Sequence, residues 1–252
     1  MKSLTSTTML WITLSLAFAS PAPARDKIIL ATLDWEPYIG RQMKNQGYLA
    51  VLVRQAFELS DIDVEIQFHQ WSRVIGLAKK GRVDGYFPEY YAHSITSYAR
   101  FSDPIPAGPL GLFSRNELKI KFTTLEDLRG YRIGIVKGYV NSREFDRTNF
   151  LDKHPVKDDL SNLRLLLAGR VDLMVADKYV GFHLLKRHMA KKMADIKFLP
   201  TILEQKDIFV CISTKGHRAH IFLDTFNKGL RQMKTDGTLD ILLPNFDNRT
   251  PQ

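Results

Sequence analysis

Hydrophobic positions along the chain alternate between two patterns, one typical of strands and one typical of helices. Residues 28–33 form a continuous apolar run, as in a buried strand, and residues 47–59 repeat apolar side chains at helical spacing. A second strand is predicted at 64–68, a helix at 71–80 and a third strand at 83–87. This β-α-β-α-β order is typical of a parallel or mixed sheet covered by helices, so the fold class is α/β.

The second half of the chain repeats this order. Its predicted elements are a strand at 132–136, helices at 141–150 and 159–168, and a strand at 171–176. The sequence Gly-Arg-Val-Asp occurs at 81–84 and again at 169–172, each time between a helix and a strand. A match of four residues also arises by coincidence in similar turns, but its place in equivalent elements supports two lobes built alike.

A segment rich in proline and glycine, residues 104–109, separates the two halves and predicts a lobe boundary. An extended strand that crosses between the lobes is predicted directly after it, at 110–115. Near the end of the chain, a strand is predicted at 206–213, with closing helices at 220–234 and 238–243.

The first 24 residues are predicted to be a signal peptide. Lys2 precedes an apolar stretch at 9–19, and small residues at 20–24 offer a cleavage site. A membrane anchor is the alternative interpretation, but the apolar stretch is much shorter than the roughly 20 residues that cross a bilayer as a helix. We therefore expect export to the periplasm.

Composition and the absence of catalytic motifs argue against several classes of function. The net charge is +9, but basic and acidic residues are interspersed, and the densest basic group, at 186–192, is typical of a solvated helix face, so no nucleic-acid partner is expected. The single cysteine, Cys211, provides neither a disulfide nor a thiolate metal site. No nucleophile elbow, phosphate-binding loop or zinc-protease helix occurs, and the histidines are scattered. We expect no catalysis, metal or cofactor.

Four stretches resemble the bacterial extracellular solute-binding proteins of family 3, the periplasmic components that bind polar amino acids for ABC transporters. They are Asp-Trp-Glu-Pro-Tyr at 34–38, Gly-Arg-Val-Asp-Gly at 81–85, Phe-Ser-Asp-Pro at 101–104, and the segment 227–239. The resemblance covers essentially the whole chain after the signal peptide, and it rests on the order and spacing of these stretches.

The resemblance implies a two-lobed periplasmic-binding-protein-like fold of type II, with two crossing strands as a hinge. Residues 25–108 and 206–252 would form lobe 1, and residues 109–205 lobe 2. The protein would be a periplasmic monomer that closes its lobes on a small polar ligand and then docks on an inner-membrane ABC permease.

Three site residues follow from the resemblance. Trp35 and Trp71 fall on the two aromatic walls that contact the ligand, and Asp177 falls where an acidic residue accepts its ammonium group. The carboxylate-binding hydroxyl residues and arginine of the family are replaced, since residues 88–91 read Pro-Glu-Tyr-Tyr and no arginine follows until Arg100.

Two features offer another source of anion affinity. Arg73, one turn into its helix, either supplies the missing cation or forms a surface ion pair. The turn at 138–140, which ends at Val140 and leads into the helix predicted from Asn141, presents backbone N–H groups that favour negative charge.

Acidic and aromatic residues instead favour an amine-bearing ligand. Glu36, Glu89 and Asp177 together predict an acidic cleft, although a hydrogen bond from a tyrosine hydroxyl is an equally good role for Glu89. The aromatic set suits stacking on a cationic or planar ligand, with Tyr38 and Tyr90 as alternative core residues; it consists of Trp35, Tyr38, Trp71, Tyr90 and Tyr91.

Two rival functions remain open at this point. The cyclohexadienyl dehydratases resemble these binding proteins and use a cleft acid, for which Asp177 or Glu89 is a candidate. Their anionic substrate requires arginine clamping, which this sequence shows poorly. A free-standing ligand sensor that works through a separate receptor is the other alternative.

Overall fold

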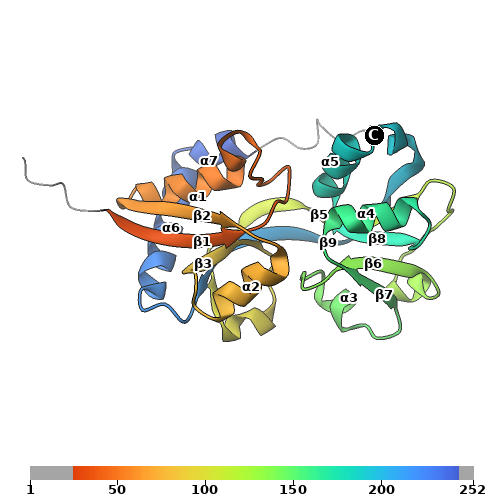
Figure 1. The fold of residues 1–252 in the computed structure, drawn as a ribbon, viewed down its shortest axis with the longest axis horizontal. Helices are drawn as coiled ribbons and strands as arrows, with labels where there is room; N and C mark the ends of the chain where they lie inside the picture. Colours follow the sequence, from red (N-terminus) through yellow and green to blue (C-terminus); the bar gives the residue numbers. More distant parts are fainter. Residues whose placement is uncertain (1–24, 244–252) are drawn as a thin grey trace, which may run out of the picture.

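The protein, here as a computed structural model, is described over residues 25–243 and consists of two lobes joined by two long strands (Figure 1). The predicted signal peptide, residues 1–24, lies outside the described residues. Within the described part, no helix is long and apolar enough to cross a membrane. The two-lobed α/β architecture predicted from the sequence is confirmed.

Lobe 1 combines an N-terminal sheet with helices from both ends of the chain. Its elements are β1 (Asp26–Thr32), α1 (Tyr48–Glu58), β2 (Ile62–Phe68), α2 (Trp71–Lys79), β3 (Gly85–Glu89), β4 (Ala99–Phe101), α6 (Ala219–Thr235) and α7 (Thr238–Leu242). Strand β1 pairs in parallel with β2 and with β3. Helices α1 and α6 pack so closely at Gly229 that a Cβ atom there would clash with the carbonyl oxygen of Ala56.

Lobe 2 repeats this plan with the middle of the chain. Its elements are β6 (Arg132–Val136), α3 (Arg143–Arg147), β7 (Asp152–Val156), α4 (Asp159–Leu167), β8 (Leu173–Asp177) and α5 (Lys178–His188). Strand β6 pairs in parallel with β7 and with β8, as β1 does with its two neighbours. The apolar face of α4, with Leu163 and Leu166, packs into a core that includes Phe113 and Met174.

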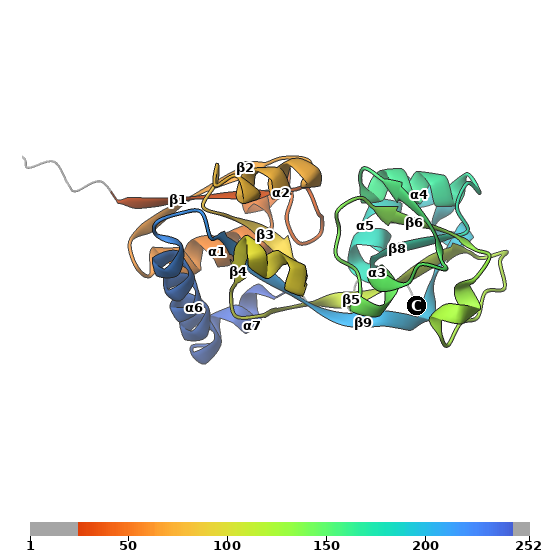
Figure 2. The ribbon, with the colours of Figure 1, turned by 90° about the horizontal axis from the view of Figure 1, so that it is seen from below.

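Strands β5 (Ile105–Arg115) and β9 (Ile196–Ser213) run side by side between the lobes and carry the sheet from one to the other (Figure 2). The strand order of the described residues is β2-β1-β3-β9-β5-β8-β6-β7, with β4 paired to β9. The predicted lobe boundaries, residues 108/109 and 205/206, therefore lie inside these two strands.

Three sequence predictions about single elements were wrong. The breaker-rich segment 104–109 does not end before the crossing strand but belongs to it, because shifts in register between Pro106 and Pro109 accommodate the prolines in the pairing with β9. The strand predicted at 206–213 begins ten residues earlier, at Ile196. The helix predicted at 141–150 shortens to α3, because Ser142 caps its start and Thr148 ends it.

The two Gly-Arg-Val-Asp turns have the same geometry in both lobes. Gly81 and Gly169 end a helix with φ of 63° and 68°, a left-handed conformation that glycine adopts without strain. The aspartate that follows, Asp84 or Asp172, then exchanges two hydrogen bonds with the first strand of its lobe, at Ile29 and at Arg132 respectively. The internal repeat predicted from the sequence is thus a repeated structural joint.

Candidate functional site

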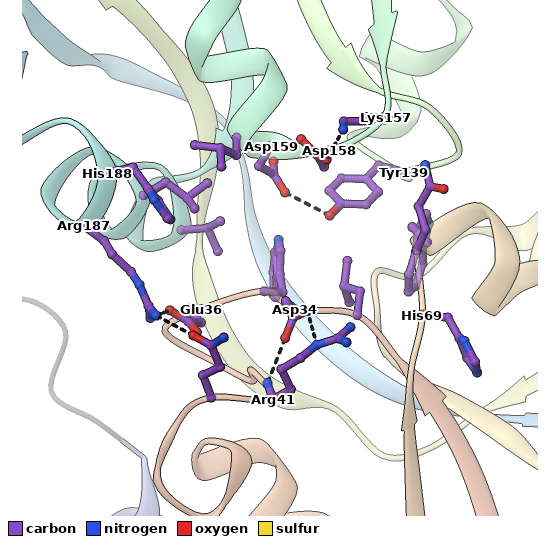
Figure 3. A pocket seen from close by; sticks show the side chains of 18 residues that line it. Asp34, Glu36, Arg41, His69, Tyr139, Lys157, Asp158, Asp159, Arg187 and His188 are labelled. Carbon is purple, nitrogen blue, oxygen red and sulfur yellow. Dashed lines mark hydrogen bonds and ion pairs between the residues drawn. The ribbon is translucent and has the colours of Figure 1, made fainter.

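Both lobes line a chamber of about 460 Å³ between them, called here the outer chamber (Figure 3). Lobe 1 contributes the segment that follows β1 and the start of α2. Lobe 2 contributes the turn after β6, the start of α4 and one face of α5. The lining residues are Leu33, Asp34, Trp35, Glu36, Arg41, Gln42, His69, Gln70, Trp71, Tyr139, Lys157, Asp158, Asp159, Leu160, Val180, Leu184, Arg187 and His188.

A second, much smaller space of about 30 Å³, the inner chamber, adjoins the outer one. Its lining consists of Leu33, Trp35, Trp71, Pro88, Glu89, Tyr90, Tyr139, Val140 and Ile208. Four of these residues line both chambers: Leu33, Trp35, Trp71 and Tyr139. An aromatic partition, made by both lobes, therefore stands between the two spaces.

Trp35 reaches the partition from the turn that follows β1. Its backbone N–H donates to the carbonyl of Ile39 at 2.8 Å, which closes the turn. The indole stacks on Tyr38, with ring centroids 4.6 Å apart and planes at 19°, and meets the edge of Tyr90. These contacts hold the buried indole in one orientation, as a rigid wall needs.

Trp71 is the first residue of α2, and its side chain contacts lobe 2. Its indole meets Tyr86 and Tyr139 edge-on, with ring centroids 5.8 and 5.7 Å apart. Its Nε1–H donates to the carbonyl oxygen of Gly138 at 3.0 Å. The side chain of Trp71 thus lines both chambers and also connects the two lobes.

Glu89, the last residue of β3, places a carboxyl group in the lining of the inner chamber, where only 4% of the residue is exposed. It accepts hydrogen bonds from the Tyr90 backbone N–H at 2.8 Å and from the Tyr86 hydroxyl at 3.3 Å. Burial raises the pKa of Glu89 to about 8, although these bonds and the charge of Lys206 oppose the rise. The tyrosine bond weighed from the sequence is present, yet the carboxyl group still lines the chamber.

Asp159 provides a second buried carboxyl group, in the outer chamber and from lobe 2. It is the first residue of α4, which Asp158 caps by accepting from the backbone N–H of Ser161. The hydroxyl of Tyr139 donates to Asp159 Oδ2 at 2.9 Å, and burial raises the pKa of Asp159 to about 7. The sequence analysis did not single out Asp159 or Tyr139. For Asp159, the available signal was the pair of acids, Asp158 and Asp159, at the start of a predicted helix.

Asp177 joins β8 to α5 and lines neither chamber. Its Oδ1 accepts from the backbone N–H groups of Tyr179 and Val180, which caps α5, and its Oδ2 accepts from Tyr38 at 2.9 Å. Burial raises the pKa of Asp177 to about 6. Asp177, the predicted acceptor of a ligand ammonium group, therefore makes these hydrogen bonds to groups of the protein itself.

The other predicted site residues divide into two groups. Trp35, Trp71, Glu89 and Val140 come together around the inner chamber. Arg73 and Tyr91 line neither chamber: Arg73 is exposed on α2, and Tyr91, 54% exposed, packs against Phe101 with ring centroids 4.9 Å apart. Directly after the turn at 138–140, which was predicted to favour an anion, the backbone N–H of Asn141 donates to Asp146.

Ion pairs surround the outer chamber and cross its rim. Glu36 of lobe 1 forms an ion pair with Arg187 and lies at hydrogen-bond distance, 2.9 Å, from the Nε2 of His183, both from α5 of lobe 2. Within lobe 1, Arg41 pairs with Asp34 at 2.8 Å (Figure 3). The lobes are therefore in contact at Glu36 as well as at Trp71.

The arrangement is suited to binding a cation. Aromatic faces attract positive charge, and a buried carboxylate gains most from a charged hydrogen-bond donor. Among residues 25–243, no group of three or more histidine, cysteine, aspartate or glutamate side chains is placed to hold a metal ion.

Solved structures share this fold at low sequence identity. A histidine kinase sensor domain with similarity to periplasmic binding proteins has a TM-score of 0.74 at 21% identity, covering 86% of this chain and 95% of that chain. An ancestral arginine-binding protein bound to arginine gives 0.73 at 20%, covering 89% and 98%. The substrate-binding protein of an amino-acid ABC transporter gives 0.69 at 18%, covering 86% and 96%.

Neither a protein-family model nor a curated protein matches the sequence. At these identities, the structural likeness establishes the periplasmic-binding-protein-like fold alone. The ligand has to be inferred from the chemistry of the two chambers.

Proposed function

We propose that this protein is a solute-binding protein, akin to extracellular family 3, that captures a small amine-bearing ligand between its lobes and delivers it to an ABC permease. The observation that carries the proposal is the inner chamber, where the carboxyl group of Glu89 meets the aromatic walls of Trp35, Trp71 and Tyr139. No cation of the described residues lies within ion-pair distance of Glu89, so an ammonium group complements the site. The two nearest supports for Glu89 are neutral donors.

Lobe closure is the proposed mechanism of capture. Ligand groups that touch Trp35 of lobe 1 and Tyr139 of lobe 2 at once bind the closed state better than the open one, so binding shifts the hinge equilibrium towards closure. The bond from Trp71 to Gly138 and the rim pair of Glu36 with Arg187 add protein contacts to the same state. Strands β5 and β9 are the proposed hinge.

The proposed setting is the periplasm, with the protein as a monomer exported by its N-terminal signal peptide. The closed form would present both lobes to the inner-membrane permease. Support comes from the signal-peptide pattern in residues 1–24 and from the shared fold with a substrate-binding protein of an ABC transporter.

A ligand screen by thermal unfolding tests the proposal directly. The protein expressed from the full-length sequence is compared with Glu89→Gln and with Glu126→Gln, which makes the same change at an exposed position outside the chambers. The probes are primary amines, amino acids and dicarboxylates. A ligand at a hundred times its Kd adds about 2.7 kcal/mol to the unfolding free energy, enough for a clear rise in Tm.

We expect amines to stabilise the wild type and Glu126→Gln, and to lose most of that effect in Glu89→Gln. The amine should be recovered unchanged, because the proposal is a binding protein and not an enzyme. Stabilisation by dicarboxylates alone, or chemical conversion of a bound compound, would favour an enzyme similar to the dehydratases. No stabilisation by any class would contradict a solute-binding role.

A further inference from the structure

The inner chamber is too small for the whole of the ligand that its walls attract. Its volume of about 30 Å³ exceeds the roughly 10–15 Å³ that admits one water molecule, but it is a small part of the about 460 Å³ of the outer chamber. A primary ammonium group fits such a space, whereas the rest of an amine has to extend past Trp35 and Tyr139 into the outer chamber. The outer chamber therefore recognises the remainder of the ligand.

Charge pairing in the outer chamber indicates what that remainder is. Its arginines and lysine each lie within ion-pair distance of a carboxylate: Arg41 with Asp34, Arg187 with Glu36, and Lys157 with Asp158. These cations are therefore already neutralised by the protein. A carboxylate on the ligand finds no unpaired arginine or lysine in the lining to bind it.

Asp159 is the one acid in the lining of the outer chamber, among the described residues, that forms no ion pair. It is 6% exposed, lies in the lining and, among residues 25–243, has no cation within ion-pair distance. Its one side-chain donor is the neutral hydroxyl of Tyr139. In the inner chamber, Glu89 likewise accepts only from neutral donors. Among the described residues, each chamber therefore contains one buried carboxyl group without a cation within ion-pair distance.

The partition between the two carboxyl groups is apolar and aromatic. Leu33, Trp35, Trp71 and Tyr139 line both chambers, and such a surface suits a methylene chain. We propose that the two chambers together bind a linear dication without a carboxylate, with one amine at Glu89, the other at Asp159 and the connecting chain between the aromatic walls. This inference rests on the proposed function and narrows it to one class of ligand.

Calorimetric titration with two matched series of compounds tests the inference. The first series is the linear diamines from diaminopropane to diaminooctane, and the second is the monoamines of the same chain lengths. The protein is the wild type, Asp159→Asn, and the control Asp152→Asn, which makes the same change at an exposed residue of β7. The buffer is kept at about pH 9, above the raised pKa values of Glu89 and Asp159, so that both carboxyl groups are mainly ionised.

We expect one chain length to bind best, at least about tenfold tighter as the diamine than as the monoamine, since a second charged hydrogen bond is worth on the order of 1.4 kcal/mol. Asp159→Asn should remove this advantage, so that the diamine and the monoamine of that length bind about equally, whereas Asp152→Asn should keep the advantage of the diamine. If Asp159→Asn fails to fold, the comparison of diamines with monoamines on the wild-type protein still tests whether a second amine subsite exists.

Three results would overturn the inference in different ways. Equal affinity for diamines and monoamines would remove the second subsite and leave the proposed function intact. Tighter binding of lysine or arginine than of any diamine would show that a carboxylate belongs to the ligand. If amines, amino acids and dicarboxylates all failed to bind, the proposed function would fail together with the inference.

Discussion

The two lobes share a joint but differ in the surfaces that they present to the cleft. In both, a left-handed glycine ends a helix and an aspartate then binds the backbone of the first strand, at Ile29 through Asp84 and at Arg132 through Asp172. The cleft surfaces show no such repeat, because lobe 1 contributes two indoles and Glu89, whereas lobe 2 contributes Tyr139 and Asp159.

This contrast separates residues that build the scaffold from residues that select the ligand. A helix that returns to a parallel strand poses the same backbone problem in each lobe, so the same glycine and aspartate solve it twice. The proposed ligand, by contrast, would present different groups to each lobe, so nothing favours repeated chemistry in the cleft. Residues in the repeat should therefore affect stability, and residues outside it should affect binding.

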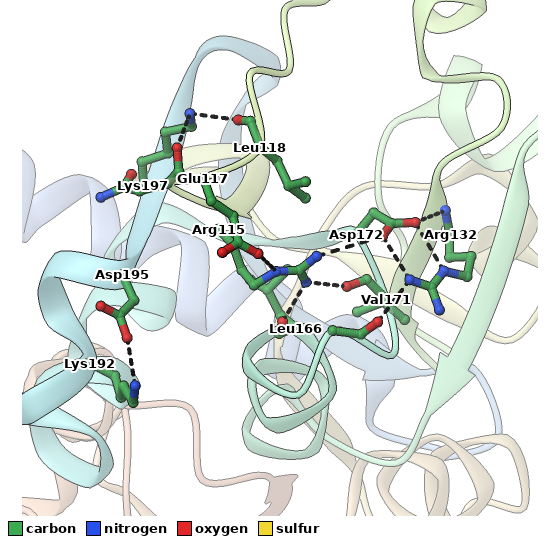
Figure 4. A network of polar contacts seen from close by, with 12 residues as sticks. Arg115, Glu117, Leu118, Arg132, Leu166, Val171, Asp172, Lys192, Asp195 and Lys197 are labelled. Carbon is green, nitrogen blue, oxygen red and sulfur yellow. Dashed lines mark hydrogen bonds and ion pairs between the residues drawn. The ribbon is translucent and has the colours of Figure 1, made fainter.

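The joints themselves differ in one respect. In lobe 2, Asp172 also pairs with the guanidinium of Arg132 at 2.8 Å and lies 3.8 Å from that of Arg115, which further binds the carbonyls of Leu166 and Val171 (Figure 4). The hydrogen bonds and charge of Arg132 lower the pKa of Asp172. The structure shows no comparable arginine partner for Asp84 among the described residues.

The largest expected effect concerns these joints. Asp172→Ala should lower the free energy of unfolding by about 3 kcal/mol, because it removes the acceptor of the Arg132 backbone N–H and guanidinium and the negative charge beside Arg115. Asp84→Ala should cost about 2 kcal/mol, since mainly the Ile29 N–H loses its partner. Urea unfolding measures both changes.

Amine affinity in these two variants sharpens the contrast. It should stay within about twofold of the wild type wherever the protein is folded. An equal or larger destabilisation by Asp84→Ala, or a strong loss of affinity in either variant, would break the division between scaffold and site.

The second effect is a dependence of amine affinity on pH. The raised pKa of Glu89, about 8, keeps its carboxyl group largely neutral below that pH, while an ammonium group needs the ionised form. Affinity should therefore rise by up to about tenfold per pH unit between pH 7 and 8, and level off above. The nearby groups that oppose this pKa rise are Tyr90 N–H, the Tyr86 hydroxyl and the charge of Lys206.

Glu89→Gln provides the control for this profile. It should bind amines weakly and lose the part of the pH dependence that Glu89 contributes. Calorimetry across this range measures both curves. A wild-type affinity that falls as the pH rises towards 8 would contradict the role given to Glu89.

The third effect tests the link between the lobes. Trp71→Phe keeps an aromatic wall but removes the Nε1–H that donates to Gly138. The closed state should lose about 1 kcal/mol, which lowers affinity about fivefold. Calorimetric titration with the best amine checks this value, and an unchanged affinity would show that the bond adds nothing to closure.

The smallest effect concerns the rim. Arg187→Ala removes a half-exposed partner of Glu36, and exposed ion pairs contribute little because solvent and salt screen them. Affinity should fall by no more than about threefold, and the difference should shrink as salt is added. A tenfold loss that persists at high salt would place Arg187 among the ligand-binding residues.

Much of the fold was predictable from periodicity and turn residues, because these patterns are local. The predicted helix 159–168 and strand 64–68 differ from α4 and β2 by at most two residues at each end. Strand β7 was not predicted, because Pro155 interrupts its pattern; it lies at the edge of the sheet, where proline is tolerated.

The candidate site was only partly predictable, because tertiary contacts decide it. Trp35, Trp71 and Glu89 line a chamber together, as their predicted roles require. Asp177 carried the expected carboxyl group, but its hydrogen bond from the Tyr38 hydroxyl depends on a tertiary contact that no local pattern encodes.

The most direct test of the account is a crystal structure of the protein grown with the amine that binds most tightly. The account predicts the ligand between the lobes, with an ammonium nitrogen within about 3 Å of a Glu89 carboxylate oxygen and the chain against Trp35 and Trp71. A ligand bound elsewhere, or one whose carboxylate faces Glu89, would contradict it.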